Sequence, residues 1–120
     1  MQTPDDSRLS DLIVALWRVV GPREHADILR FGDYDVSPSG SGKYFALTED
    51  GARDFARNPF NRDRILTLTR IDIPRADLDL GFVFNDIGGA GLSVHFADDV
   101  LPVIYEHATL SGGVQLLGPP

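Results

Sequence analysis

Residues 42–57, GKYFALTEDGARDFAR, decide how the rest of the chain is interpreted. The first part, residues 43–47, is short, aromatic and apolar, which is typical of a buried strand. Thr48 can then accept hydrogen bonds from the free N–H groups at the start of a helix. Apolar residues follow at helical spacing, at Ala52, Phe55 and Ala56. The sequence therefore predicts a strand that runs directly into a capped helix, with Tyr44 and Thr48 at or near the junction.

Length and composition limit the kinds of protein that this chain can be. The chain has 120 residues, of which 42% are hydrophobic, and this suffices for one self-standing core. We expect residues 1–120 to form a single domain with flexible ends at 1–10 and 118–120. Because the chain has no cysteine, disulfides and thiolate chemistry are excluded. The formal net charge of −7 argues against a broad nucleic-acid surface, which needs clustered Lys and Arg.

The sequence carries no sign of a membrane partner. No apolar run reaches the length of a membrane span, and residues 1–10 lack the charged-then-apolar plan of a signal peptide. We expect a protein that acts in the cytoplasm, or one that is delivered into a target cell as part of a larger secreted protein.

The order of the predicted elements indicates an α+β domain. A strand over residues 16–20 is followed by Pro22, which suits the first turn of a helix over residues 23–31. Apolar alternation and turn residues predict four later segments: strands at 65–73, 77–84 and 92–96, and a hairpin made of 108–110 and 114–117. The type of residues 100–105 stays open because Pro102 interrupts them. We expect short N-terminal helices and a mostly antiparallel sheet. Whether that sheet is split into two parts is not decided by the sequence pattern.

The strand predicted at residues 65–73 changes phase along its length. Leu66 and Leu68 point to one face, whereas the isoleucines at positions 71 and 73 point to the other. This change predicts a β-bulge near Thr69. The strand ends at Pro74, which has no N–H to donate to a ladder.

Arg18 is the first candidate for a functional residue. It lies within the apolar run VALWRVV, residues 14–20. A guanidinium in such a run must either reach solvent from the strand or pair with an anion. Two interpretations stay open: Arg18 belongs to the polar face of a half-exposed strand, or it is a bidentate clamp for a phosphate or carboxylate.

Other candidates lie on the central strand and on the later segments. Tyr44 and Phe45 occupy opposite faces of their strand, so one belongs to the core and the other can line a cleft. The histidines at positions 25, 95 and 107 show no metal-ligand spacing, and we expect no metal site. His95 shares a strand face with Ser93 and is a candidate base. Glu106 is a candidate late-strand acid.

Arg18 on an early strand, a helix after Pro22, and the segment KYFALTEDGARDFA resemble the ADP-ribosyltransferase fold. The resemblance includes the compact C-terminal toxin domains of bacterial polymorphic toxins. It implies a split antiparallel sheet that grips NAD as a substrate. It also implies an early Arg or His on the nucleotide and an aromatic residue stacked on nicotinamide. A late acidic residue would steady the ribose oxocarbenium as nicotinamide leaves.

The resemblance assigns roles to individual residues of this chain. Arg18 matches the first position and Tyr44 or Phe45 the second, with Thr48 close by. Four acidic residues compete for the third position: Asp86, Asp98, Asp99 and Glu106. The predicted catalytic residues are Arg18, Tyr44, Glu106 and Asp86, and the predicted NAD-binding residues are Arg18, Tyr44, Phe45 and Thr48. One departure is Val19, which stands where the family usually has a small or hydroxyl residue.

Three functions compete. The first is an NAD-consuming ADP-ribosyltransferase or NAD glycohydrolase, a toxin or effector with a protein or nucleic-acid acceptor and a cognate immunity protein. Its chemistry needs an acidic pocket and one phosphate-holding Arg, without metal or cysteine. The second is a small toxin ribonuclease of α+β fold that uses the histidines, against which the net charge of −7 counts. The third is a non-enzymatic, acidic binding or immunity-type domain.

Overall fold

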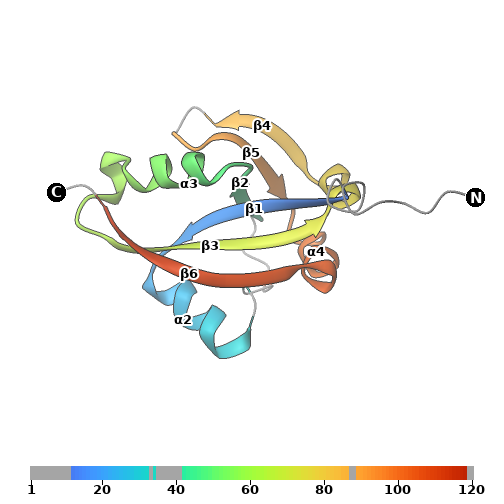
Figure 1. Cartoon of the computed structure of the whole chain (residues 1–120), viewed down its shortest axis with the longest axis horizontal. Helices are drawn as coiled ribbons and strands as arrows, with labels where there is room; N and C mark the ends of the chain where they lie inside the picture. Colours follow the sequence, from blue (N-terminus) through green and yellow to red (C-terminus); the bar gives the residue numbers. More distant parts are fainter. Residues whose placement is uncertain (1–11, 33, 35–41, 87–88, 119–120) are drawn as a thin grey trace, which may run out of the picture.

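The computed structural model describes residues 12–32, 34, 42–86 and 89–118 (Figure 1). Its strands are β1 (Ile13–Val20), β2 (Lys43–Ala46), β3 (Ile65–Pro74), β4 (Phe82–Asp86), β5 (Gly91–Phe96) and β6 (Thr109–Leu117). Its α-helices are α2 (Pro22–Phe31), α3 (Glu49–Ala56) and α4 (Leu101–His107), and its 3-10 helices are η1 (Pro59–Asn61) and η2 (Arg75–Leu80). The strands form one six-stranded sheet in the order β4-β5-β2-β1-β3-β6. Every pairing in it is antiparallel.

The prediction of an α+β domain with a mostly antiparallel sheet is confirmed, but the predicted N-terminal placement of the helices is wrong. β1 precedes α2, and α4 lies between β5 and β6, so the helices are interleaved with the strands. Residues 100–105, whose type was open, belong mainly to α4. Pro102 fits there because it lies in the first turn, where its missing N–H leaves no bond unmade. None of the described helices is long and apolar enough to cross a membrane.

Each face of the sheet is covered by different helices (Figure 1). On one face, α2 and α4 pack on the larger core, which includes Leu16, Phe45 and Ile71. On the other face, α3 packs on a smaller cluster that includes Ala46 and Leu68. The alternation of side chains along the strands explains this arrangement, because neighbouring residues such as Phe45 and Ala46 face opposite layers.

The predicted strand-to-helix junction is confirmed. Thr48 is the N-cap of α3, and its Oγ1 accepts a hydrogen bond from the N–H of Gly51 at 3.0 Å. Gly51 lies so close to the turn before β5 that a Cβ there would be 2.1 Å from the carbonyl oxygen of Ala90. Glycine at this position therefore lets the first turn of α3 touch the β4–β5 hairpin, which brings three elements together at one place.

The sheet is joined at its centre by a short contact. A single residue pair, Trp17 and Ala46, links β1 to β2 in the described chain, whereas β1 pairs with β3 over its whole length. Beyond that pair the two strands no longer form a ladder, and the Arg18 side chain donates from Nη1 to the carbonyl oxygen of Tyr44 at 3.0 Å. The sheet is thus continuous, but its two three-stranded halves are joined by few backbone bonds.

A register irregularity lies near Thr69, as predicted, but its extra residue is in β6, since β3 pairs with β1 without interruption; the predicted hairpin is wrong. The β3–β6 register shifts between Leu68 and Arg70, which pair with Val114 and Ser111. The turn-forming residues of this region therefore lie inside one continuous strand, β6. Gly113 is needed there, because a Cβ on it would lie 2.3 Å from Cγ2 of Thr67.

The strand predicted at residues 77–84 is wrong in its first part, and only residues 82–84 belong to a strand, β4. After β3 ends at Pro74, the chain forms η2 and enters β4 only at Phe82. The side chain of Asp77 is buried against α4, where its Oδ2 lies 3.0 Å from Nδ1 of His107. Residues 75–80 thus join β3 to β4, and Asp77 within them contacts a distant segment.

Candidate functional site

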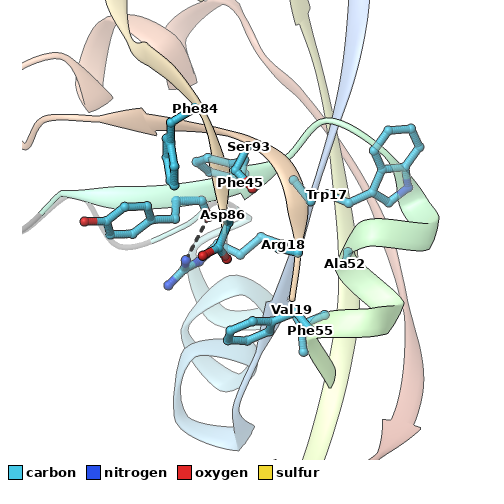
Figure 2. A pocket seen from close by; sticks show the side chains of 12 residues that line it. Trp17, Arg18, Val19, Phe45, Ala52, Phe55, Phe84, Asp86 and Ser93 are labelled. Carbon is cyan, nitrogen blue, oxygen red and sulfur yellow. Dashed lines mark hydrogen bonds between the residues drawn. The ribbon is translucent and has the colours of Figure 1, made fainter. Parts of the chain in front are cut away.

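A pocket of about 80 Å³ opens beside the junction of β1 and β2 (Figure 2). Residues of β1, β2, α3, β4 and β5 line it, and its polar groups include Arg18, Asp86 and Ser93. The volume is below that of the roughly 150 Å³ cavity that holds a benzene ring. The pocket therefore has room for the edge of one ring or a small group, and a larger ligand would extend beyond its mouth.

The pocket brings together four of the residues that the sequence singled out. Arg18, Tyr44, Phe45 and Asp86 all line it, although they come from three different strands. Thr48 is not among the lining residues, since its hydroxyl caps α3.

The other acidic candidates lie elsewhere. Glu106, predicted to be on a late strand, is exposed on helix α4 and does not line the pocket. Asp98 and Asp99 lie in the turn before α4. Of the four acidic residues that competed for one position, Asp86 is the one that the fold places at the pocket.

The Arg18 guanidinium is held at three points. Its Nε and Nη2 donate to Oε2 and Oε1 of Glu24 at 2.7 and 2.9 Å, and its Nη1 donates to the Tyr44 carbonyl oxygen. The two bonds to Glu24 form the planar fork in which guanidinium and carboxylate match best. A guanidinium carries five N–H groups. These contacts use three, so one on Nη1 and one on Nη2 stay available to a ligand.

The electrostatics keep this pair ionised. Burial alone would lower the pKa of Arg18, but the hydrogen bond and the charge of Glu24 outweigh it and raise that pKa above its ordinary value. Burial would likewise raise the pKa of Glu24, but the hydrogen bond and charge of Arg18, and then the charge of Lys43, lower it. Lys43 Nζ lies 3.6 Å from Oε1 of Glu24. Both partners are therefore charged at neutral pH.

The lowered pKa of Glu24 predicts an acid limit to stability. In the unfolded chain Glu24 takes up a proton near its ordinary pKa of 4.5, whereas in the folded chain it does so at lower pH. The contribution of ionised Glu24 to the free energy of unfolding is therefore complete above pH 4.5. It is lost as the pH falls through the lowered pKa. We expect urea unfolding of the wild type to lose stability over this window more steeply than unfolding of Glu24→Gln. Equal slopes for the two proteins would contradict the assignment.

Tyr44 and Phe45 face opposite sides of β2, as predicted. The Tyr44 side chain is 52% exposed, and its ring contacts the rings of Phe84 and His95 with centroid distances of 5.9 and 4.5 Å. The Phe45 side chain is 1% exposed and contacts the rings of Tyr34 and Phe96. Tyr44 therefore offers an accessible aromatic surface at the pocket, and Phe45 forms part of its floor and of the core.

No family model, no curated protein and no solved structure matches this chain. The site is therefore interpreted from its own chemistry: a fixed cation, an accessible aromatic ring and a half-buried carboxylate at one pocket. Glu24 and Phe84 were not predicted from the sequence to belong to the site. A usable signal for Glu24 was its place in the first turn of the helix that follows the Arg18 strand, where an acidic residue is favourable.

The three histidines lie on different elements. His25 is on α2, His95 contacts Tyr44 from β5, and His107 pairs with Asp77. Within the described ranges no group of three His, Asp or Glu side chains could hold a metal ion. The histidines thus form no common centre in the described part of the chain.

Proposed function

We propose that this chain is an NAD-consuming enzyme, an ADP-ribosyltransferase or an NAD glycohydrolase, which acts as a toxin or effector domain. The observation that carries the proposal is the meeting of Arg18 and Tyr44 at one pocket, where the guanidinium is bonded to the Tyr44 backbone at 3.0 Å. These are the two residue types that the resemblance requires on the first two core strands. The substrate is NAD, the acceptor is a protein, a nucleic acid or water, and a cognate immunity protein is the expected partner.

The residues of the pocket divide the chemistry between them. The two remaining N–H groups of Arg18 bind a phosphate oxygen of NAD, and the exposed ring of Tyr44 stacks on nicotinamide. The bond between nicotinamide and C1′ of the ribose breaks, and its electron pair leaves with nicotinamide. The acceptor nucleophile then adds to C1′ and loses its proton.

Asp86 is our choice for the acidic residue. The departure of nicotinamide builds positive charge on the ribose, which a nearby carboxylate stabilises. Asp86 lies at the end of β4, is half-buried and lines the same pocket as Arg18. A half-buried carboxylate acts more strongly on such a charge than an exposed one, because less water screens it.

Nicotinamide release from NAD tests the proposal. We expect the wild type to release nicotinamide and Asp86→Asn to lower kcat by about a hundredfold or more. Glu106→Gln is the matched comparison, because it makes the same change to an exposed carboxylate on α4. Loss of activity in Glu106→Gln but not in Asp86→Asn would transfer the role to Glu106. A wild type that neither releases nicotinamide nor gains thermal stability with NAD would overturn the proposal.

A non-enzymatic binding domain is the second candidate, because one surface is unusually aromatic. The Phe82 side chain is 69% exposed and stacks on that of Phe84 with a centroid distance of 6.1 Å. Phe84 in turn contacts Tyr44. Exposed aromatic groups of this kind are enriched at protein interfaces. This candidate predicts that Phe82→Ser weakens partner binding while no nicotinamide is released by any variant.

A further inference from the structure

The clamp on Arg18 is built by the turn that connects β1 to α2. β1 ends at Val20, and Gly21 and Pro22 reverse the chain into α2. Glu24, in the first turn of that helix, is thereby folded back over Arg18, which lies six residues earlier. The fork between the two side chains is thus a product of local chain geometry and does not depend on a distant loop.

We propose that Glu24 is a positioning residue that orients Arg18 toward a phosphate group of NAD; this inference rests on the proposed function. A carboxylate bonded to Nε and Nη2 fixes the plane of the guanidinium, and the Tyr44 carbonyl oxygen fixes it from a third side. The remaining N–H groups lie on Nη1 and Nη2. The plane fixed by Glu24 sets the direction of both donors toward a phosphate oxygen, which a lysine ammonium could not do.

Lys43 gives the arrangement its net positive charge. An isolated Arg18–Glu24 pair would be neutral and would attract an anion weakly. With Lys43 Nζ at 3.6 Å from Glu24, the three charged groups sum to +1 on a chain whose formal charge is −7. Glu24 can therefore hold the guanidinium in place without cancelling its attraction for a phosphate.

The groups around Glu24 favour its ionised state from several elements. Arg18 of β1 and Lys43 of β2 contact it directly, and the nearby Tyr34 and Tyr105 raise the pKa of Arg18. A second, open pocket places further charges beside Glu24: Arg23 and Asp27 of α2, and Arg64 next to β3. Cations thus outnumber anions around the carboxylate.

Three variants test the positioning role. Glu24→Gln keeps the shape of the side chain but loses its charge, and Glu24→Asp keeps the charge on a shorter stem. Asp27→Asn is the matched control, since Asp27 lies three residues later on α2 and lines the same second pocket without a described contact to Arg18. In each variant, KM and kcat for nicotinamide release are measured, together with the nitrogen-15 NMR signal of the Arg18 Nε–H. Arg18→Lys identifies that signal.

The expected result is a change in substrate affinity at nearly constant turnover. Glu24→Gln should raise KM for NAD at least tenfold with kcat changed less than threefold, because Arg18 binds the phosphate equally in the ground and transition states. Its Nε–H signal should be lost to rapid exchange. Glu24→Asp should show smaller changes in KM and in the Nε–H signal than Glu24→Gln. Asp27→Asn should leave KM and that signal as in the wild type.

Other outcomes overturn the inference separately from the proposed function. A lower kcat at constant KM in Glu24→Gln would show a merely structural role. A Glu24→Gln protein that keeps the protected Nε–H signal would show that Glu24 does not hold Arg18. A wild type that neither binds NAD nor releases nicotinamide would overturn the proposed function and, with it, the assignment of NAD, while the NMR signal would still decide whether Glu24 orients Arg18.

Discussion

Replacing Arg18 by leucine is expected to lower the free energy of unfolding by about 2–3 kcal/mol and to abolish NAD binding. The substitution leaves the Glu24 carboxylate largely buried with only the more distant Lys43 as a partner, and a buried charge that loses its main partner is costly. We place the loss below that of a fully buried pair, because 22% and 21% of the two side chains are exposed and solvent screens part of the charge. Urea denaturation and calorimetry with NAD measure the two effects.

The double variant Arg18→Leu/Glu24→Leu separates stability from function. Because the double variant has no buried carboxylate that has lost its main partner, most of the lost stability should return. NAD binding should stay absent, because the double variant still lacks the guanidinium. A double variant that is as unstable as the single one would show that Arg18 stabilises the fold mainly through packing or through its bond to the Tyr44 carbonyl group.

Phe45→Ala is expected to have the largest effect on stability, about 3–5 kcal/mol. Phe45 belongs to the main core and lies between Tyr34 and Phe96, with ring centroid distances of 5.5 and 6.0 Å. Its removal leaves a cavity that the paired strands around it cannot fill. Although it lines the pocket, any loss of NAD binding should follow from this damage to the core.

Tyr44→Ala is the matched control for Phe45→Ala, because it removes the neighbouring ring from the opposite face of β2. With half of the Tyr44 side chain exposed, the loss of stability should be below about 1 kcal/mol, while nicotinamide release should fall sharply. Urea denaturation of both variants checks the difference. A larger loss of stability in Tyr44→Ala than in Phe45→Ala would contradict the description of Tyr44 as the exposed and Phe45 as the buried side chain of β2.

The parts of the fold that could be predicted from the sequence are those that depend on neighbouring residues. The Thr48 cap and the apolar stripe of α3 are local, and both were confirmed. The apolar pattern of residues 65–73 located the register irregularity near Thr69, but it could not show that the extra residue lies in the partner strand β6. The strand predicted at residues 77–84 begins only at Phe82. The preceding residues form η2, and Asp77 within it contacts His107, 30 residues away, a contact that no local pattern reveals.

The candidate site was predictable in part for the same reason. Arg18 was conspicuous as a charge among apolar residues, and Tyr44 by its place before a capped helix. Choosing between Asp86 and Glu106 required the fold, because the two carboxylates differ in their distance from the pocket and not in their sequence surroundings. The fork to Glu24 depends on how sharply the chain turns after Val20, which the sequence does not specify.

The single residue pair between β1 and β2 has a mechanical consequence. Trp17 and Ala46 act as a pivot between two stiff plates, β4-β5-β2 and β1-β3-β6. A change in the angle between the plates breaks few backbone hydrogen bonds, because there is almost no ladder at the pivot to break. The angle between the plates is therefore set by the side chains that both share, because the main core includes Leu16 of β1 and Phe45 of β2.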